Sequence, residues 1–110
     1  MATIKSSREI DTIFRGAKRV AAPLLIVLVA QTPEGRGRFG RVAFIAGKKL
    51  GGAVLRNRCR RVLRASVQRL RGPWPGYDVV LIARSGTARA SAEILDRALE
   101  GALKRASVVQ

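Results

Sequence analysis

The sequence predicts an α+β fold in which helices pack on one small mixed sheet as a two-layer sandwich. Apolar residues recur at helical spacing in three segments, near residues 7–16, 51–71 and 91–105. Four short β-branched or aliphatic runs lie between these segments, separated by turns that contain Gly or Pro. The expected order is therefore helix, three strands, helix, strand, helix. The chain has 110 residues, of which 47% are hydrophobic, and we expect one domain over residues 1–110.

The first predicted helix covers about Ser7–Gly16. Ser6 and Glu9 fit a capping box, in which the two side chains bind free N–H groups at the start of the helix. A brief strand over Lys18–Val20 follows, and we expect it to end at Pro23 because proline lacks the N–H group that a sheet needs.

The next two strands are expected to form a hairpin. Leu24–Gln31 is aliphatic and β-branched, which is typical of a buried strand, and Arg38–Ala46 is predicted to be the return strand. Thr32–Gly37 contains Pro and Gly and is predicted to be the turn between them.

A basic loop with Lys48 and Lys49 leads into the longest predicted helix, over Gly51–Arg71. On a helical wheel its small and aliphatic residues gather on one face, namely Leu55, Cys59, Val62, Leu63, Ser66 and Leu70. The other sides are almost entirely basic, with Arg56, Asn57, Arg60, Arg61 and Arg64 opposite and Arg58 and Arg69 at the border. The helix is therefore expected to bury one face and to present arginines on the other.

Residues 71–78, RGPWPGYD, stop this helix and turn the chain into a strand over Val79–Ala83. After a loop, Ser91 is expected to cap the last helix. The strand near Phe44 and the strand over Val79–Ala83 are joined through a helix, so we expect them to be parallel. General statistics favour a right-handed sense for such a crossover.

The charge of the chain favours a polyanionic partner. The net charge is +15, and twelve of the 22 basic residues lie between Glu34 and Asp78, with no acidic residue among them. Arg56 and Arg60 are like charges four residues apart, which destabilises a helix by about a few tenths of a kcal/mol. A solvated face is the simplest interpretation of a charge run, but charges of one sign without local carboxylates favour nucleic acid. An anionic membrane is the alternative, disfavoured because the helix carries no Trp or Phe.

Residue types for catalysis by the protein itself are scarce. The chain has no His, and its seven acidic residues form no evident acid–base pair or metal-binding cluster. We therefore predict no catalytic residue, no protein-held metal and no small-molecule substrate. Cys59 is predicted to be a small core residue, and Asp78, at a strand start, to serve a turn or cap.

The expected location is the cytoplasm. The N-terminus, MATIKSSRE, lacks the apolar core of a signal peptide. Leu24–Ala30 is apolar but too short to span a bilayer.

Two motifs occur together in a fixed order. In RVAFIAGKKLGGAVLRNRCRRVLR, residues 41–64, a strand leads through a basic Lys-Gly loop into a helix that carries an Arg-Asn-Arg motif at Arg56–Arg58. GYDVVLIAR, residues 76–84, supplies the next strand, and a looser match extends over about residues 7–103. This combination resembles the protein subunit of bacterial ribonuclease P.

The resemblance implies an αβββαβα fold whose parallel crossover has the rare left-handed sense, and we follow it on this point. It implies contacts with the catalytic RNA of ribonuclease P from Lys48, Lys49, Arg56, Asn57, Arg58, Arg60, Arg61 and Arg64. It also implies a cleft between the first helix and the sheet for the 5′ leader of precursor tRNA, with Phe14, Lys18 and Arg19 as its residues. Mg²⁺ would be held mainly by the RNA subunit.

Three functions are compatible with a small basic domain of this kind. The leading one is the RNA-binding subunit of ribonuclease P, which removes the 5′ leader from precursor tRNA and whose catalytic centre lies in the RNA. The alternative is a small basic ribosomal protein or another structural RNA-binding protein, which shares the size and charge but has no reason to carry both motifs in order. A nuclease acting alone is disfavoured by the missing His and clustered acids. For Phe14, a place in the core is the alternative to the leader cleft.

Overall fold

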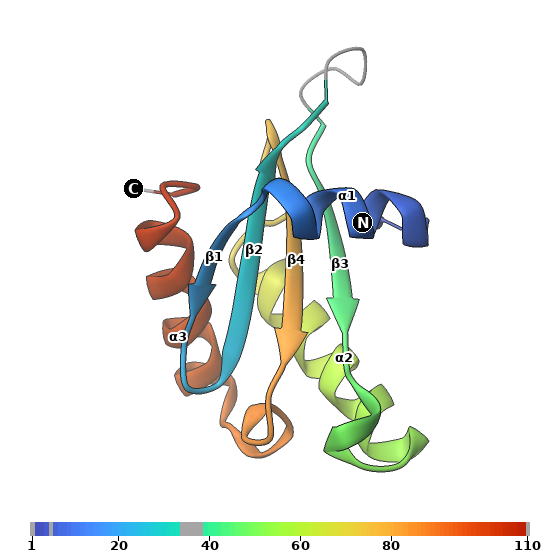
Figure 1. Ribbon diagram of the computed structural model, residues 1–110. Helices are drawn as coiled ribbons and strands as arrows, with labels where there is room; N and C mark the ends of the chain where they lie inside the picture. The colour runs from blue at the N-terminus through green and yellow to red at the C-terminus, as the bar shows by residue number, and fades with distance from the viewer. Residues whose placement is uncertain (1, 5, 34–38, 110) are drawn as a thin grey trace.

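The computed structural model describes residues 2–4, 6–33 and 39–109 and contains a four-stranded sheet with helices on both faces (Figure 1). Its elements in chain order are α1 (Ser7–Gly16), β1 (Lys18–Ala21), β2 (Leu25–Gln31), β3 (Arg41–Ile45), the 3₁₀ helix η1 (Lys48–Leu50), α2 (Ala53–Arg69), β4 (Tyr77–Ala83), the 3₁₀ helix η2 (Thr87–Arg89) and α3 (Ala92–Arg105). The predicted α+β class and the order of helices and strands are confirmed. The 3₁₀ helices η1 and η2 were expected to be loops.

The sheet has the strand order β1-β2-β4-β3, and this order corrects the predicted hairpin. β4 lies between β2 and β3, antiparallel to β2 and parallel to β3. The strands β2 and β3 therefore follow each other in the chain without pairing. A turn was predicted between them at Thr32–Gly37. Residues 34–37 of this turn lie outside the described residues.

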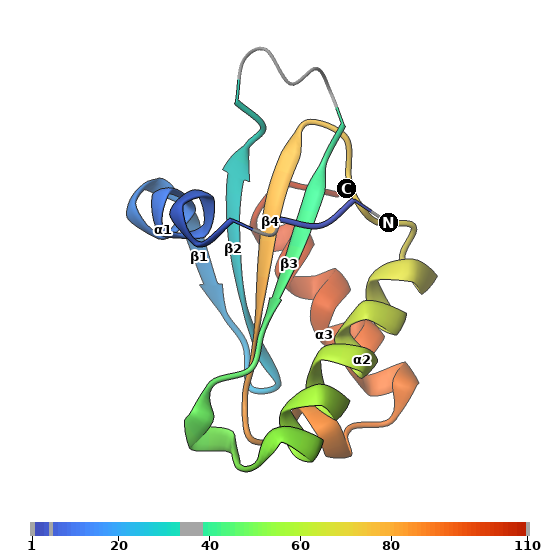
Figure 2. The ribbon, with the colours of Figure 1, turned by 90° about the vertical axis from the view of Figure 1, so that its right-hand side faces the viewer.

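The crossover from β3 through α2 to β4 is left-handed. Figure 1 shows β3 and β4 running in the same direction, with β4 nearer the middle of the sheet and α2 behind it, and Figure 2 shows α1 and α2 on opposite faces. The face on which α2 packs decides the handedness. α2 lies on the α3 side because its buried Leu63 and Val67 belong to one core cluster with Leu95 and Leu99 of α3.

Two hydrophobic clusters hold the sheet between its helices. The larger one joins α2 and α3 to strand residues that are fully buried, among them Val27, Val42, Val79 and Leu81. The smaller one lies under α1, on the other face of the sheet, and its buried members are Ile4, Ile13, Leu28, Ala43 and Val80. α1 covers only one end of its face, so the main sandwich has two layers, the sheet and the α2–α3 pair (Figure 2).

The helix boundaries agree with the local signals in the sequence. The Ser6 hydroxyl accepts a hydrogen bond from the backbone N–H of Glu9 at 3.4 Å and caps α1. Ser91 caps α3 in the same way, accepting from the backbone N–H of Ile94 at 3.2 Å. Both caps satisfy donors that a helix leaves free in its first turn.

An ion pair fastens α2 to α3. Arg69 donates two hydrogen bonds to the Asp96 carboxylate, from Nε at 2.7 Å and from Nη2 at 2.8 Å. The buried Ser66 hydroxyl donates a third at 2.6 Å. The Arg69 guanidinium, and to a lesser degree the Ser66 hydroxyl, lower the pKa of the Asp96 carboxyl below its ordinary value.

Leu63→Ala is expected to lower the free energy of unfolding by about 2–5 kcal/mol, because Leu63 is fully buried in the larger cluster and its removal leaves a cavity. Val54→Ala on the same helix is the control, since Val54 is 86% exposed and its loss should change stability by less than about 0.5 kcal/mol. Urea unfolding followed by the fluorescence of Trp74, the only tryptophan, measures both. Equal effects of the two variants would contradict the assigned buried face.

Asp96→Asn should make the free energy of unfolding depend less on pH in the acidic range. Since folding lowers the pKa of Asp96, its contribution is complete above the unfolded-state pKa and disappears as the pH falls through the folded-state value. The variant should therefore be less stable than the parent chain at pH 7, and the difference should shrink as the pH falls from the ordinary pKa of an aspartate through the lower folded-state value. Urea unfolding at each pH measures the difference, and a difference that stays constant over this interval would contradict a role for the charge.

Candidate nucleic-acid interface

The loop before α2 exposes two lysines. Lys48 and Lys49 lie on η1, and both are exposed. Gly51 follows with φ of 141°, a backbone conformation that L side chains rarely adopt, and a Cβ there would lie 3.0 Å from the Leu55 side chain. This glycine lets the chain turn directly from η1 into α2, so that both lysines lie next to the first turn of that helix.

The arginine face of α2 is the largest group of basic residues in the predicted site. We define it by five arginines and one asparagine, namely Arg56, Asn57, Arg58, Arg60, Arg61 and Arg64. Cys59, Leu63 and Val67 lie on the other side of the helix and are buried, as the helical wheel predicted. Arg56 and Arg60 are half-buried, and the other four residues of the face are exposed.

Three of these arginines have uncharged partners. Arg60 Nη2 donates to Asn57 Oδ1 at 2.7 Å. Arg58 Nε donates to the backbone carbonyl of Ala88 at 3.3 Å, which links α2 to η2. The Arg64 guanidinium carbon lies 5.3 Å from the centre of the Phe44 ring.

Carboxylates are absent from this face. Within the described part of the chain, no arginine of the face lies within 4.0 Å of an Asp or Glu oxygen. The basic residues that do form ion pairs are elsewhere, and among them are Arg41, Arg69, Arg97 and Lys104. Among the described residues, no carboxylate therefore neutralises the charge of the arginine face.

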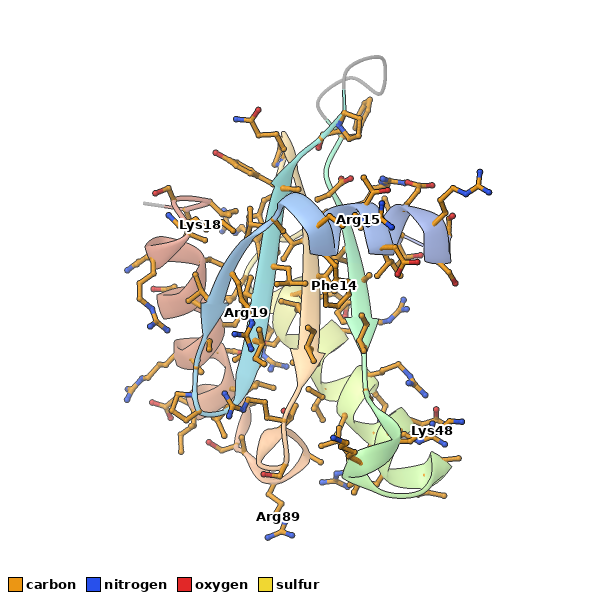
Figure 3. All side chains as sticks on the ribbon, in the orientation of Figure 1. Phe14, Arg15, Lys18, Arg19, Lys48 and Arg89 are labelled. Atoms are coloured by element: carbon orange, nitrogen blue, oxygen red, sulfur yellow. The ribbon has the colours of Figure 1, made fainter. Side chains whose placement is uncertain are left out.

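The structure adds two basic residues that the sequence analysis missed. Arg84 follows β4 and Arg89 ends η2, and together with Lys49 they line a hollow of about 150 Å³ beside Leu55 and Cys59. Arg89 and Lys48 lie at the end of the molecule opposite α1 (Figure 3). The available signal was the basic residues of the loop after β4, but the sequence did not show that this loop returns to the start of α2.

The three residues expected in the leader cleft are not on one surface. Phe14 is 48% exposed, which excludes the alternative that it belongs to the core. Arg19 pairs with Leu28, so both lie on the face of the sheet that α1 crosses, on the same side as Phe14 (Figure 3). Lys18 pairs with Val29, whose side chain belongs to the α2–α3 cluster, and thus lies on the opposite face.

α1 divides its face of the sheet into two areas. Phe14 and Arg19 lie on the same side of the sheet as partly exposed isoleucines of three strands, and we call this group of residues the open sheet face: Phe14, Arg19, Ile26, Ile45 and Ile82. Beside α1 there is also a cavity of about 210 Å³, lined by Glu9, Thr12 and Gly16 of α1 and by residues of the sheet. The hollow beside α1 is therefore separate from the open sheet face.

A partly buried ion network joins α1 to the sheet beside this cavity. Arg41 Nη2 lies 2.6 Å from Glu9 Oε2 and 2.8 Å from Asp78 Oδ2. Asp78 is 1% exposed within β4, so the predicted turn or cap role for it is wrong. The hydrogen bond to Asp78 raises the pKa of the Arg41 guanidinium, which stays charged at any pH of interest.

Neither a metal cluster nor a membrane span is found in the part of the chain that the structure describes. No three His, Cys, Asp or Glu residues among residues 2–4, 6–33 and 39–109 lie together in a way that could hold a metal ion. Glu9 and Asp78 are two acidic residues that line the cavity, and Arg41 lies between their carboxylates and binds both. No described helix is long and apolar enough to cross a bilayer.

Together, the fold and the arginine face define a small α+β protein built to bind a polyanion. The Ribonuclease P family model matches residues 1–107. The chain is 36% identical over 108 residues to the ribonuclease P protein component of Syntrophomonas wolfei, with 97% of this chain and 88% of the relative covered. It is 35% identical over 109 residues to that of Brevibacillus brevis, with 97% and 84% covered. The chain therefore belongs to the ribonuclease P protein family, whose members are subunits of an endoribonuclease that matures the 5′ end of precursor tRNA.

Solved structures agree with this assignment. The ribonuclease P protein of Staphylococcus aureus superposes with a TM-score of 0.84 at 25% identity, covering 100% of this chain and 99% of that one. The ribonuclease P protein from Thermotoga maritima superposes with a TM-score of 0.80 at 24% identity, covering 96% and 97%, and at this identity supports the fold alone. The sequence resemblance to this family is thus confirmed.

Arg61→Ala is expected to weaken binding to ribonuclease P RNA and to reduce the slope of log affinity against log salt by roughly 0.7 to 0.9, the value for one lost phosphate contact. Arg61 is exposed and belongs to the carboxylate-free face. Arg97→Ala on α3 removes the same charge from an exposed arginine that is paired with Glu93, and should leave the slope unchanged. Filter binding or fluorescence anisotropy from low to moderate salt measures both slopes, and a similar reduction in both variants would contradict a specific role for α2.

Proposed function

We propose that the arginine face of α2, together with Lys48 and Lys49, binds the catalytic RNA of ribonuclease P, with residues 1–110 acting as one RNA-binding domain. The observation that carries this proposal is the absence of carboxylate partners from the arginine face among the described residues. Phosphates of RNA would supply the missing negative charge, and the counterions they release would favour binding. The lysines beside the N-terminus of α2, where the helix dipole also attracts anions, support the same partner.

The open sheet face is the proposed site for the 5′ leader of precursor tRNA. The exposed Phe14 ring offers a surface on which a base of a single strand can stack, and Arg19 offers a cation for its backbone. Lys18 is on the opposite face of β1. It could contact the RNA leader only if the leader passes around the β1 edge of the sheet.

The Mg²⁺ required for phosphodiester hydrolysis is proposed to be held mainly by the RNA subunit. The described residues do not fit a protein site for this ion, because they contain no group of three possible metal ligands and the two acids near the cavity are bridged by Arg41. The proposed partners are therefore the catalytic RNA and precursor tRNA, with the cytoplasm as the place of action, and neither a membrane nor a small-molecule substrate is proposed.

The chain without RNA should not cleave precursor tRNA at any Mg²⁺ concentration. Hydrolysis needs an activated water, and the chain contains no histidine while its arginines cannot act as bases near neutral pH. Adding ribonuclease P RNA should give cleavage at the correct 5′ site, and the gain from the protein should be largest at low Mg²⁺, where its charge replaces counterions.

The measurement is a cleavage assay over a Mg²⁺ series with nuclease-treated protein, RNA alone and the reconstituted pair. Correct 5′ processing by the protein alone would overturn the proposal. An equal rate with RNA alone and with the pair at low Mg²⁺ would also contradict it.

A further inference from the structure

We propose that Asn57 and Phe44 are positioning residues, which hold Arg60 and Arg64 in place for RNA phosphates while leaving their charge intact. The inference rests on the proposed binding of RNA by the arginine face of α2. In this inference Asn57, the middle residue of the Arg-Asn-Arg motif, does not contact RNA itself. It orients the Arg60 side chain, which does.

Asn57 and Arg60 are one helical turn apart on the exposed side of α2. Asn57 Oδ1 accepts a hydrogen bond of 2.7 Å from Arg60 Nη2. A guanidinium has five N–H groups, so four remain available for phosphate oxygens. Because an amide oxygen carries no net charge, this bond fixes the direction of the side chain and does not neutralise it.

Phe44 acts on Arg64 from a different element. It lies on β3, where it is partly buried against the larger hydrophobic cluster, and this packing fixes its ring. The Arg64 guanidinium carbon lies 5.3 Å from the ring centre, within the range at which an aromatic face attracts a cation. Because an aromatic ring carries no net charge, this contact does not neutralise Arg64.

The contrast with the other arginines supports this assignment. Arg41 and Arg69 are held by carboxylates, at 2.8 Å from Asp78 and 2.7 Å from Asp96, and both join two elements of the fold. A carboxylate holds a guanidinium more firmly but cancels its charge, which would weaken the attraction to RNA. Arg60 and Arg64 have partners that restrict the side chain before binding, so that less conformational entropy is lost when RNA binds.

The first test is a double-mutant cycle on the affinity of the full chain for ribonuclease P RNA, with Asn57→Ala, Arg60→Ala and the double variant. Asn57→Ala should weaken binding roughly two- to tenfold, the range expected for ordering one long side chain. In the Arg60→Ala background the same substitution should change affinity by less than about a factor of two. Gln68→Ala, which removes another exposed amide from α2, is the matched control and should have no effect.

Asn57→Asp separates position from charge. The aspartate can still accept from Arg60 but adds a negative charge to the arginine face, so binding should be weaker than with Asn57→Ala and the salt slope should be smaller. Asn57→Ala should leave the salt slope within error of that of the parent chain, because no charge is lost. The added charge weakens binding whatever the role of Asn57, so the positioning role itself is decided by the cycle with Arg60→Ala.

Phe44→Leu with Arg64→Ala forms the second cycle. Leucine keeps apolar packing in the cluster while removing the aromatic face, and the unfolding curve followed through Trp74 reports whether the chain remains folded. Phe44→Leu should weaken RNA binding in the parent chain and have no further effect in the Arg64→Ala background.

The outcomes separate the inference from the function on which it rests. If Arg60→Ala and Arg64→Ala both leave affinity unchanged, the proposed RNA-binding role of the arginine face fails, and the positioning roles fail with it. If Arg60→Ala weakens binding but Asn57→Ala is harmless, or weakens binding equally in both backgrounds, only the positioning role of Asn57 is overturned. If Arg64→Ala weakens binding but Phe44→Leu is harmless, or weakens binding equally in both backgrounds, only the positioning role of Phe44 is overturned.

Discussion

The insertion of β4 between β2 and β3 is the constraint on which the rest of the structure depends. β2 and β3 do not pair with each other, so the sheet is continuous only through β4, whose residues Val79–Leu81 are fully buried. The parallel pairing with β3 requires a crossover, and α2 provides it on the α3 side of the sheet. Asp78, at the start of β4, also binds Arg41 and through it Glu9 of α1. One strand therefore determines where both the arginine face and α1 are held.

The chain separates the arginines that stabilise the fold from those that remain available for a partner. Arg41 is paired with carboxylates where α1 contacts the sheet. Arg69 is paired with a carboxylate where α2 contacts α3. On the arginine face the partners described by the structure are a carbonyl, an amide oxygen and an aromatic ring. Since a nearby carboxylate would compete with phosphate, this distribution leaves positive potential on α2 without weakening the core.

The class of fold could be predicted from the sequence because helix caps and hydrophobic periodicity are local. The limits of α1 and the caps at Ser6 and Ser91 follow from residues within one turn of each other. The hairpin prediction failed because adjacency along the chain favours pairing of consecutive strands, whereas the burial of β4 on both faces gives it the inner position. General statistics also gave the wrong hand for the crossover. The hand depends on the face to which α2 packs, and that face is a property of the whole core.

The sequence by itself determined most of the arginine face, because the helical period alone places Arg56, Asn57, Arg60, Arg61 and Arg64 opposite the apolar residues of α2, with Arg58 at the border. The sequence analysis placed Lys18 and Arg19 together in the leader cleft, although adjacent residues of a strand point to opposite faces of a sheet. Only the tertiary structure decided which of the two shares a face with Phe14, because that depends on the face that α1 crosses. The tertiary structure also decided that Lys49, Arg84 and Arg89 line one hollow. These residues come from three separate segments, and only the packing of α2, β4 and η2 brings them together.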